Sequence, residues 1–220
     1  MIKSRTLLSA AAIGFTALGG MSFNAGFAQA QSMTPAGTPS NTEGMVVGVH
    51  VSGASLAVNG GKSETGGGGG VLIGYGFNRQ FMLYVGFDVA KVQASIVAED
   101  QTSSYTLSHV DLGLRYSFAN PDRRLVPYVN AAITGRSASA TISGTNISTS
   151  GPAFTGGGGI QYFVNSKVAL DANLQYTTGK FSKVKVGGTS SDISNAGNSN
   201  SARINLGVRF YPNLGTSLQK

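Results

Sequence analysis

Apolar and other residues alternate along most of this chain, and this period of two constrains the fold more than any other feature of the sequence. Every second residue is apolar over residues 81–90, 109–118, 168–177 and 202–210, and the residues between them are mostly small, polar or charged. Successive side chains of a β-strand point to opposite faces, so each segment predicts a strand with one apolar face. Beyond residue 30 there is no run of 18 or more apolar residues, so the sequence predicts no transmembrane helix.

Weaker alternation extends the pattern to eight strands between residues 45 and 211. The remaining strands are predicted at residues 47–58, 67–77, 127–142 and 154–163, and two of the strong segments extend to 81–98 and 167–186. Short connections at 78–80, 119–125 and 165–166 alternate with longer polar connections at 59–66, 99–104, 144–151 and 187–200. Outer-membrane barrels have short periplasmic turns and longer outward loops. We therefore expect an all-β fold, an eight-stranded antiparallel up-and-down transmembrane β-barrel with both termini on the periplasmic side.

The first 30 residues have the order of a secretory signal peptide. Lys3 and Arg5 precede the apolar stretch 7–18, and Ala28-Gln29-Ala30 predicts cleavage after Ala30. An N-terminal membrane anchor is the alternative interpretation. Residues 31–44 lack periodicity and are predicted to be a flexible periplasmic lead-in, residues 45–211 the barrel, and residues 212–220 a short C-terminal tail. The chain is thus expected to be exported to the outer membrane of a Gram-negative bacterium.

The composition fits a membrane surface. Glycine contributes 32 of 220 residues without a Gly-X-Y period, only 11% of residues are charged, and Cys and Trp are absent. This excludes collagen, disulfide chemistry and thiolate metal sites, and the low charge argues against a disordered chain. The net charge is +7, yet basic and aromatic residues are not interleaved, so we expect no nucleic-acid partner.

A secreted β-sandwich would also show a period of two, but three features favour a membrane barrel. The polar faces carry charges of both signs, which must be paired inside a narrow lumen. Aromatic residues gather beside the short turns, as an interfacial girdle requires. The predicted strands 81–98 and 167–186 exceed the usual length of strands in soluble domains. The charged residues expected to form a polar network in the lumen are Asp88, Asp111, Arg115, Arg136, Asp171, Arg203 and Arg209. The aromatics expected in the girdle are Tyr75, Phe77, Phe81, Phe118, Tyr128, Tyr162, Phe163, Phe210 and Tyr211.

The chain resembles the small outer-membrane β-barrels of the OmpA and opacity-protein superfamily. The resemblance covers residues 45–211 and is carried by the eight alternating segments, the turn at 119–122 leading into 125–128, and the last strand at 204–210. In that family the barrel-assembly machinery reads an aromatic at the end of the last strand, and Phe210 and Tyr211 match this assembly signal. Here nine further residues follow Tyr211.

No motif in the sequence predicts a cofactor or a metal. Residues 60–63 lack the first glycine of a phosphate-binding loop, and the glycine runs at 66–70 and 156–159 lie between strand patterns. His50 and His109 face the predicted lumen without a third ligand at metal spacing. Residues 194–197 resemble the motif of a lipid A deacylase, but Asp192 stands where that family has its catalytic His, so the general base is missing.

The function most consistent with these patterns is that of a non-enzymatic integral outer-membrane protein that supports envelope integrity and makes surface contacts or adhesion through its outward loops. A narrow channel for small solutes is the alternative, although an eight-stranded barrel is just filled by its side chains. A lipid A-modifying enzyme is a third hypothesis. The expected partners are outer-membrane lipid and lipopolysaccharide, the barrel-assembly machinery, and host or surface ligands of the loops. Four lysines are predicted to contact lipopolysaccharide phosphates at the outer strand ends: Lys91, Lys180, Lys183 and Lys185.

Overall fold

The described part of the chain folds almost entirely into β-strands. The structure is a computed structural model, and it describes residues 40–58, 63–94, 103–120, 122–142, 144–193 and 198–212. The strands are β1 (Gly44–Val58), β2 (Glu64–Gly76), β3 (Phe81–Ala94), β4 (Ser103–Ser117), β5 (Leu125–Ile142), β6 (Thr145–Asn165), β7 (Val168–Lys180), β8 (Lys183–Val186), β9 (Thr189–Asp192) and β10 (Asn198–Phe210). Within these residues, no helix has the length and apolar character needed to cross a membrane.

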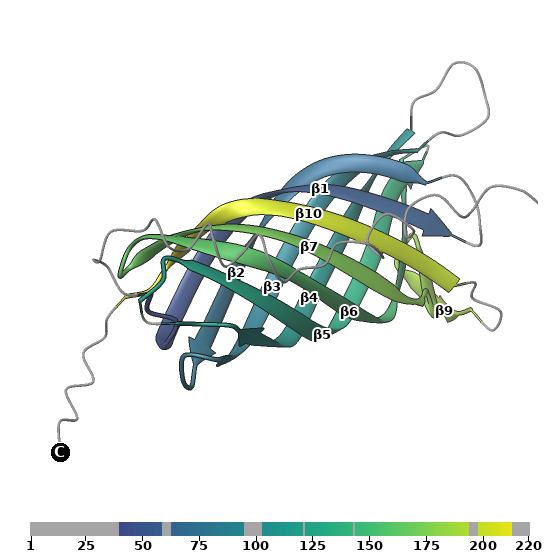
Figure 1. The fold of residues 1–220 in the computed structure, drawn as a ribbon. Coiled ribbons are helices and arrows are strands. Elements are labelled where there is room, and N and C mark those ends of the chain that lie inside the picture. The colour runs from purple at the N-terminus through teal and green to yellow at the C-terminus, as the bar shows by residue number, and fades with distance from the viewer. Residues whose placement is uncertain are drawn as a thin grey trace, which may run out of the picture. The chain divides into compact units, whose positions relative to one another are not determined.

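Eight of the strands close into a barrel. Strands β1 to β6 each pair antiparallel with the next strand, and β10 pairs with both β7 and β1, so that the first and last strands complete the wall. Figure 1 shows β10 between β1 and β7. This confirms the predicted eight-stranded antiparallel up-and-down barrel. The remaining strands, β8 and β9, pair with each other. β8 also pairs with the first residues of β6, so this hairpin extends the sheet at one end of the barrel.

The two ends of the barrel differ. The chain enters β1 and leaves β10 at one end, which also carries the connections 77–80, 118–124 and 166–167, and we call this the turn end. The opposite end, the loop end, carries the β8–β9 hairpin and lies where the β1 arrow points in Figure 1. The alternation between short and long connections therefore predicted correctly which connections share an end.

The apolar faces of the strands point outward. Large apolar side chains such as Val51, Ile133 and Ile204 are 60–71% exposed in the middle of the wall. Such exposure would be unfavourable in water, whereas lipid tails solvate these side chains without cost. The alternate positions point into the lumen and are buried.

All four predicted outward loops contain strand residues, because β2 already begins at Glu64 and β4 at Ser103, and the other two loops are affected more. The predicted loop 144–151 is strand from Thr145 onward, because β5 and β6 form a tight hairpin in which Gly144 has a φ of +79°. The predicted loop 187–200 contains β9 and the first residues of β10. These segments are rich in serine and threonine, whose polarity predicted loops. Small and β-branched side chains are equally compatible with an exposed strand.

The predicted seventh strand, 167–186, is interrupted. β7 ends at Lys180 and β8 resumes at Lys183, with both strands paired to β6. Ala153 of β6 pairs with Gly179, and Ser150 of β6 pairs with Lys183. The segment from Gly179 to Lys183 therefore contains one residue more than the β6 segment that it faces. This is the geometry of a β-bulge, and it redirects the chain around Phe181. The third strand is described only to Ala94, so residues 95–98 lie outside the described residues.

The end of the predicted lead-in packs against the turn end. The Ser40 hydroxyl donates to the carbonyl of Asn120 at 3.0 Å, and the Thr42 hydroxyl donates to the carbonyl of Arg79 at 2.7 Å. Both side chains are buried, so residues 40–43 are held by two different turns rather than forming a free linker. The signal peptide, residues 31–39 and residues 213–220 lie outside the described residues, and their assignments stay predictions.

Candidate functional site

The lumen holds the charged residues that the sequence singled out. Their strand positions alternate with the outward apolar positions, so the pleat directs all seven side chains inward. All seven are buried, with exposed fractions of 5% or less. They separate into two ion clusters and one isolated arginine.

The first ion cluster is built around Arg203 of β10. Its Nη1 donates to Asp88 Oδ2 on β3 at 2.9 Å, and its Nη2 donates to Asp111 Oδ2 on β4 at 2.8 Å. His50 Nε2 lies 2.6 Å from the second oxygen of Asp88. The Arg203 guanidinium therefore links β10 to β3 and β4 across the lumen. Each of the two carboxylates also has a further partner.

A line of threonines extends this cluster around the wall. The Thr134 hydroxyl on β5 donates to Asp111 Oδ1 at 2.6 Å and lies 2.6 Å from the Thr155 hydroxyl on β6. Thr155 in turn lies 2.7 Å from Thr177 on β7. A hydroxyl both donates and accepts, so such a chain can carry the polarisation of Asp111 across three strands.

The second ion cluster is built around Asp171 of β7, nearer the turn end. Arg209 Nη2 donates to Asp171 Oδ1 at 3.1 Å, and Arg115 Nη1 lies 3.8 Å from Oδ2. The Tyr128 hydroxyl donates to Oδ2 at 3.0 Å. The Arg115 guanidinium lies 3.8 Å from the centre of the Tyr128 ring, a stacked cation–π contact. One buried carboxylate thus serves two arginines.

Arg136 departs from the prediction that lumen charges are paired. Among the residues that the structure describes, no carboxylate lies within ion-pair distance of it. It donates instead to the hydroxyl and carbonyl of Ser199 and lies 4.7 Å from the centre of the Phe181 ring. The lumen set contains four arginines and three aspartates, so one cation is left over, and Arg136 near the loop end is that cation.

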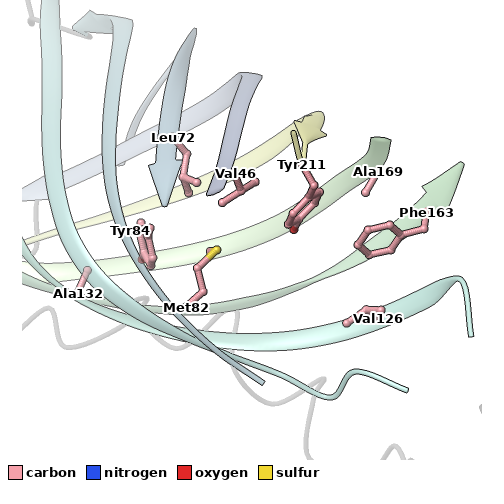
Figure 2. Packing of buried hydrophobic residues seen from close by; sticks show 9 residues of the cluster. All are labelled: Val46, Leu72, Met82, Tyr84, Val126, Ala132, Phe163, Ala169 and Tyr211. Atoms are coloured by element: carbon pink, nitrogen blue, oxygen red, sulfur yellow. The ribbon is translucent and has the colours of Figure 1, made fainter. Parts of the chain in front are cut away.

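An apolar plug fills the lumen at the turn end. Figure 2 shows Met82, Tyr211 and Phe163 directed from different strands into the interior, with Val46, Leu72 and Val126 around them. The rings of Phe163 and Tyr211 lie 5.4 Å apart, and the Tyr211 hydroxyl donates to Gln161. A smaller apolar cluster of Leu56, Val92 and Leu107 lies toward the loop end. Apolar side chains therefore lie at both ends of the polar region.

The plug corrects the predicted aromatic girdle. Tyr128, Phe163 and Tyr211 are buried inside the lumen, with exposed fractions of 3% or less. The other six predicted girdle residues are 45–63% exposed on the outside. The predicted assembly-signal pair is divided in the same way, because Phe210 points outward and Tyr211 belongs to the plug. Strict counting of odd and even positions along each strand would have separated the two groups.

The two histidines take part in the polar filling. His109 Nε2 lies 3.2 Å from the Ser201 hydroxyl, and Asp111, two residues along the same strand, is engaged by Arg203 and Thr134. In the described part of the chain, no group of three His, Cys, Asp or Glu side chains could hold a metal ion. The lipid A deacylase-like residues 194–197 lie outside the described residues, while Asp192 lies exposed on β9.

The four predicted lipopolysaccharide-contacting lysines lie on the outside, toward the loop end. Lys91 is exposed on β3 and Lys180 at the end of β7. Lys183 and Lys185 belong to β8, beyond the bulge, rather than to the seventh strand itself.

Glycine makes room for the bulky lumen side chains. A Cβ atom on Gly113 would lie 2.6 Å from Cζ and Oη of Tyr84, and a Cβ on Gly159 would lie 2.8 Å from the Tyr128 hydroxyl. Both tyrosines belong to the region of the second ion cluster, since the Arg115 guanidinium lies 5.9 Å from the centre of the Tyr84 ring and 3.8 Å from that of the Tyr128 ring. Glycine therefore admits a bulky neighbouring side chain at these two positions of the wall.

Comparisons with known proteins agree with this architecture. The family model of the outer membrane protein beta-barrel domain matches residues 14–211. Neisserial surface protein A is 21% identical with a TM-score of 0.60, over 76% of this chain and 97% of that chain. OprG from Pseudomonas aeruginosa is 12% identical with a TM-score of 0.54, over 78% of this chain and 97% of that chain. A search of curated proteins finds no match. The chain belongs to the outer membrane protein beta-barrel family.

Proposed function

We propose that this protein is a closed, non-enzymatic barrel that supports the integrity of the outer membrane and makes surface contacts through its loop end. The observation that carries the proposal is the filled lumen. The two ion clusters and the apolar plug occupy the interior with side chains from all eight barrel strands. An eight-stranded barrel is only wide enough for such a filling, so a packed lumen supports a structural role over transport.

The energetics of the lumen support the same conclusion. A hydrated ion would have to separate Arg203 from Asp88 and Asp111, and Asp171 from Arg209, before it could pass. Separating a buried charge from its partner costs several kcal/mol. The hydrated ion would also have to displace the rings of Phe163 and Tyr211, which lie 5.4 Å apart in the apolar plug.

The loop end supplies a surface for contacts. Both termini of the barrel lie at the turn end, which supports a periplasmic turn end, as in the topology typical of outer-membrane barrels. The loop end would then face outward with the β5–β6 hairpin and the β8–β9 hairpin forming a continuous sheet. The exposed residues of β9 are Thr189, Ser190, Ser191 and Asp192, a polar surface.

Planar-bilayer recording tests whether the barrel is closed. The purified wild-type protein is expected to insert without a steady, reproducible open state, because the plug and both ion clusters stay in place. An open porin recorded in the same bilayer shows that insertion and detection work. Folding of the barrel itself is verified by its faster migration on an unheated gel than on a heated one.

Two lumen variants and one surface variant separate a real channel from contamination. A steady open state that disappears in Arg115→Ala or Arg209→Ala and persists in Arg79→Ala would establish a narrow channel and overturn the proposal. Arg79 is the matched control because it lies in an exposed turn, 3.6 Å from Glu43 and outside the lumen. Conductance that all variants share would come from a contaminating porin.

Protease treatment of intact cells tests the orientation. Residues 187–200 are expected to be cleaved by an added broad-specificity protease, while the turns at 77–80 and 118–124 are protected until the outer membrane is opened. Peptide mapping by mass spectrometry identifies the cleaved bonds. Cleavage confined to the turn end would contradict an outward loop end and, with it, a role in surface contact.

A further inference from the structure

The outer surface of β4, β5 and β6 changes abruptly from apolar to hydroxyl-bearing. Directly opposed residues of antiparallel strands point to the same face, so the register defines cross-strand rows. Leu112, Ile133 and Phe154 form one row, followed toward the loop end by the row Val110, Gly135 and Pro152. The next two rows are Ser108, Ser137 and Ser150, and then Thr106, Ser139 and Ser148. We call these last six residues the hydroxyl panel. Rows are about 7 Å apart, so the outer surface changes from apolar to hydroxyl-bearing between one row and the next.

A groove crosses this boundary. It has a volume of about 550 Å³, and its lining includes Val110 and Ile133 on the apolar side and Ser137, Ser150 and Lys183 on the other. Gly135 forms part of its floor, and a Cβ atom built there would meet nothing within 4 Å. The missing side chain at Gly135 therefore leaves space that an outside molecule can occupy, on a face where apolar residues contact lipid.

Lysines flank the hydroxyl panel on both sides. Lys91 on β3 directly opposes Thr106, and Lys185 on β8 directly opposes Ser148, so both lie in one row with three hydroxyls between them. Four strand spacings separate these two lysines, or about 19 Å along the sheet. Lys183 opposes Ser150 in the neighbouring row and has Asp192 on its other side, without an ion pair between them in the described structure. Three lysines and one aspartate leave the panel with a positive charge.

We infer that this surface binds a phosphorylated, acylated saccharide, which in this membrane is the lipid A part of lipopolysaccharide. The apolar rows would contact an acyl chain, the hydroxyl panel would exchange hydrogen bonds with sugar hydroxyls, and the lysines would attract phosphates as point charges. A glycerophospholipid has no sugar to match six hydroxyls. The inference rests on the outward loop end of the proposed function, because lipopolysaccharide occupies the outer leaflet.

Binding to the full barrel in detergent micelles tests the site. Bisphosphorylated lipid A is titrated into the isotope-labelled protein, and amide resonances are followed by NMR. Shifts are expected at Gly135, Ser137 and Ser139 and not at Ser55 on the other side of the barrel. Gly135→Leu fills the groove and is expected to weaken binding about tenfold, the effect of displacing roughly two methylene groups of an acyl chain. Lys91→Ala and Lys185→Ala are each expected to weaken binding about fivefold.

The controls match each variant. Gly53→Leu places the same side chain on β1, four strands away, where a Cβ also meets nothing within 4 Å, and Lys167→Ala removes an exposed lysine at the turn end. Both are expected to bind like the wild type. Equal binding of Gly135→Leu and Gly53→Leu, or equal binding of phosphatidylglycerol and lipid A, would overturn the inference. A steady conductance would overturn the closed barrel and leave this titration unaffected, so the two failures are distinguishable.

Discussion

Replacing Arg203 with Met is expected to lower the free energy of unfolding by about 3–5 kcal/mol, because it leaves buried carboxylates without their shared cation. Asp88 would keep His50, and Asp111 would keep Thr134, but neither partner is a permanent charge. Methionine keeps an unbranched stem in place of the arginine stem and lacks the guanidinium head, so the substitution removes the cation while the packing of the stem is retained. The measurement is the urea-induced unfolding of the barrel in phospholipid vesicles, followed by its gel migration and circular dichroism.

Arg136→Met is the matched control in the same lumen. Arg136 has serine and aromatic partners but no carboxylate among the described residues, so its removal strands no negative charge. Replacing a buried cation that has no counter-ion is expected to leave stability unchanged or to raise it. Equal destabilisation by both variants would show that packing, rather than ion pairing, determines the contribution of Arg203.

Asp171→Asn is expected to cost about 3–5 kcal/mol of unfolding free energy for the opposite reason. The substitution keeps the shape of the side chain but removes the one carboxylate that lies within ion-pair distance of Arg209 and Arg115 in the described structure. Both guanidinium groups are buried, so water cannot replace the lost partner without opening the barrel. The same unfolding measurement applies.

A double substitution tests whether the cost comes from the stranded arginines. Adding Arg209→Met to Asp171→Asn removes one stranded cation and is expected to recover about 0.5–3 kcal/mol relative to the sum of the single effects. Asp192→Asn, on exposed β9, is the control and is expected to change stability by about 0.5 kcal/mol or less. Strict additivity of the two lumen substitutions would contradict a shared ion cluster.

The lumen and the outer groove lie on opposite faces of the same strands. The inward face of β4 carries the buried lumen residues His109, Asp111 and Arg115, while its outward face carries Thr106 and Ser108 of the hydroxyl panel. Because neighbouring residues of a strand belong to opposite faces, a substitution at an outward position can change lipid contact without disturbing the contacts in the lumen. This separation is what allows the outward variants to be tested in a folded barrel.

Much of the fold was predictable from the sequence because the pattern is local. The period of two placed Asp88, Asp111, Asp171 and the four arginines on one face of their strands, and all are buried in the lumen. The alternation between short and long connections placed the strands in up-and-down order. The predicted girdle was wrong at Tyr128, Phe163 and Tyr211. These residues lie beside turns, but their positions along the strands belong to the inward face, so their rings are buried in the lumen.

The sequence by itself determined that this chain forms an outer-membrane barrel with a charged lumen, because alternation, connection length and composition are properties of neighbouring residues. Only the tertiary structure decided that Arg203 pairs with two aspartates, that Arg136 pairs with none among the described residues, and that an apolar plug fills the turn end. The hydroxyl panel and the groove also depend on register, which aligns Ser108, Ser137 and Ser150 across three strands. Barrel closure sets these alignments, and a one-residue shift in pairing would send every side chain of a strand to the other face.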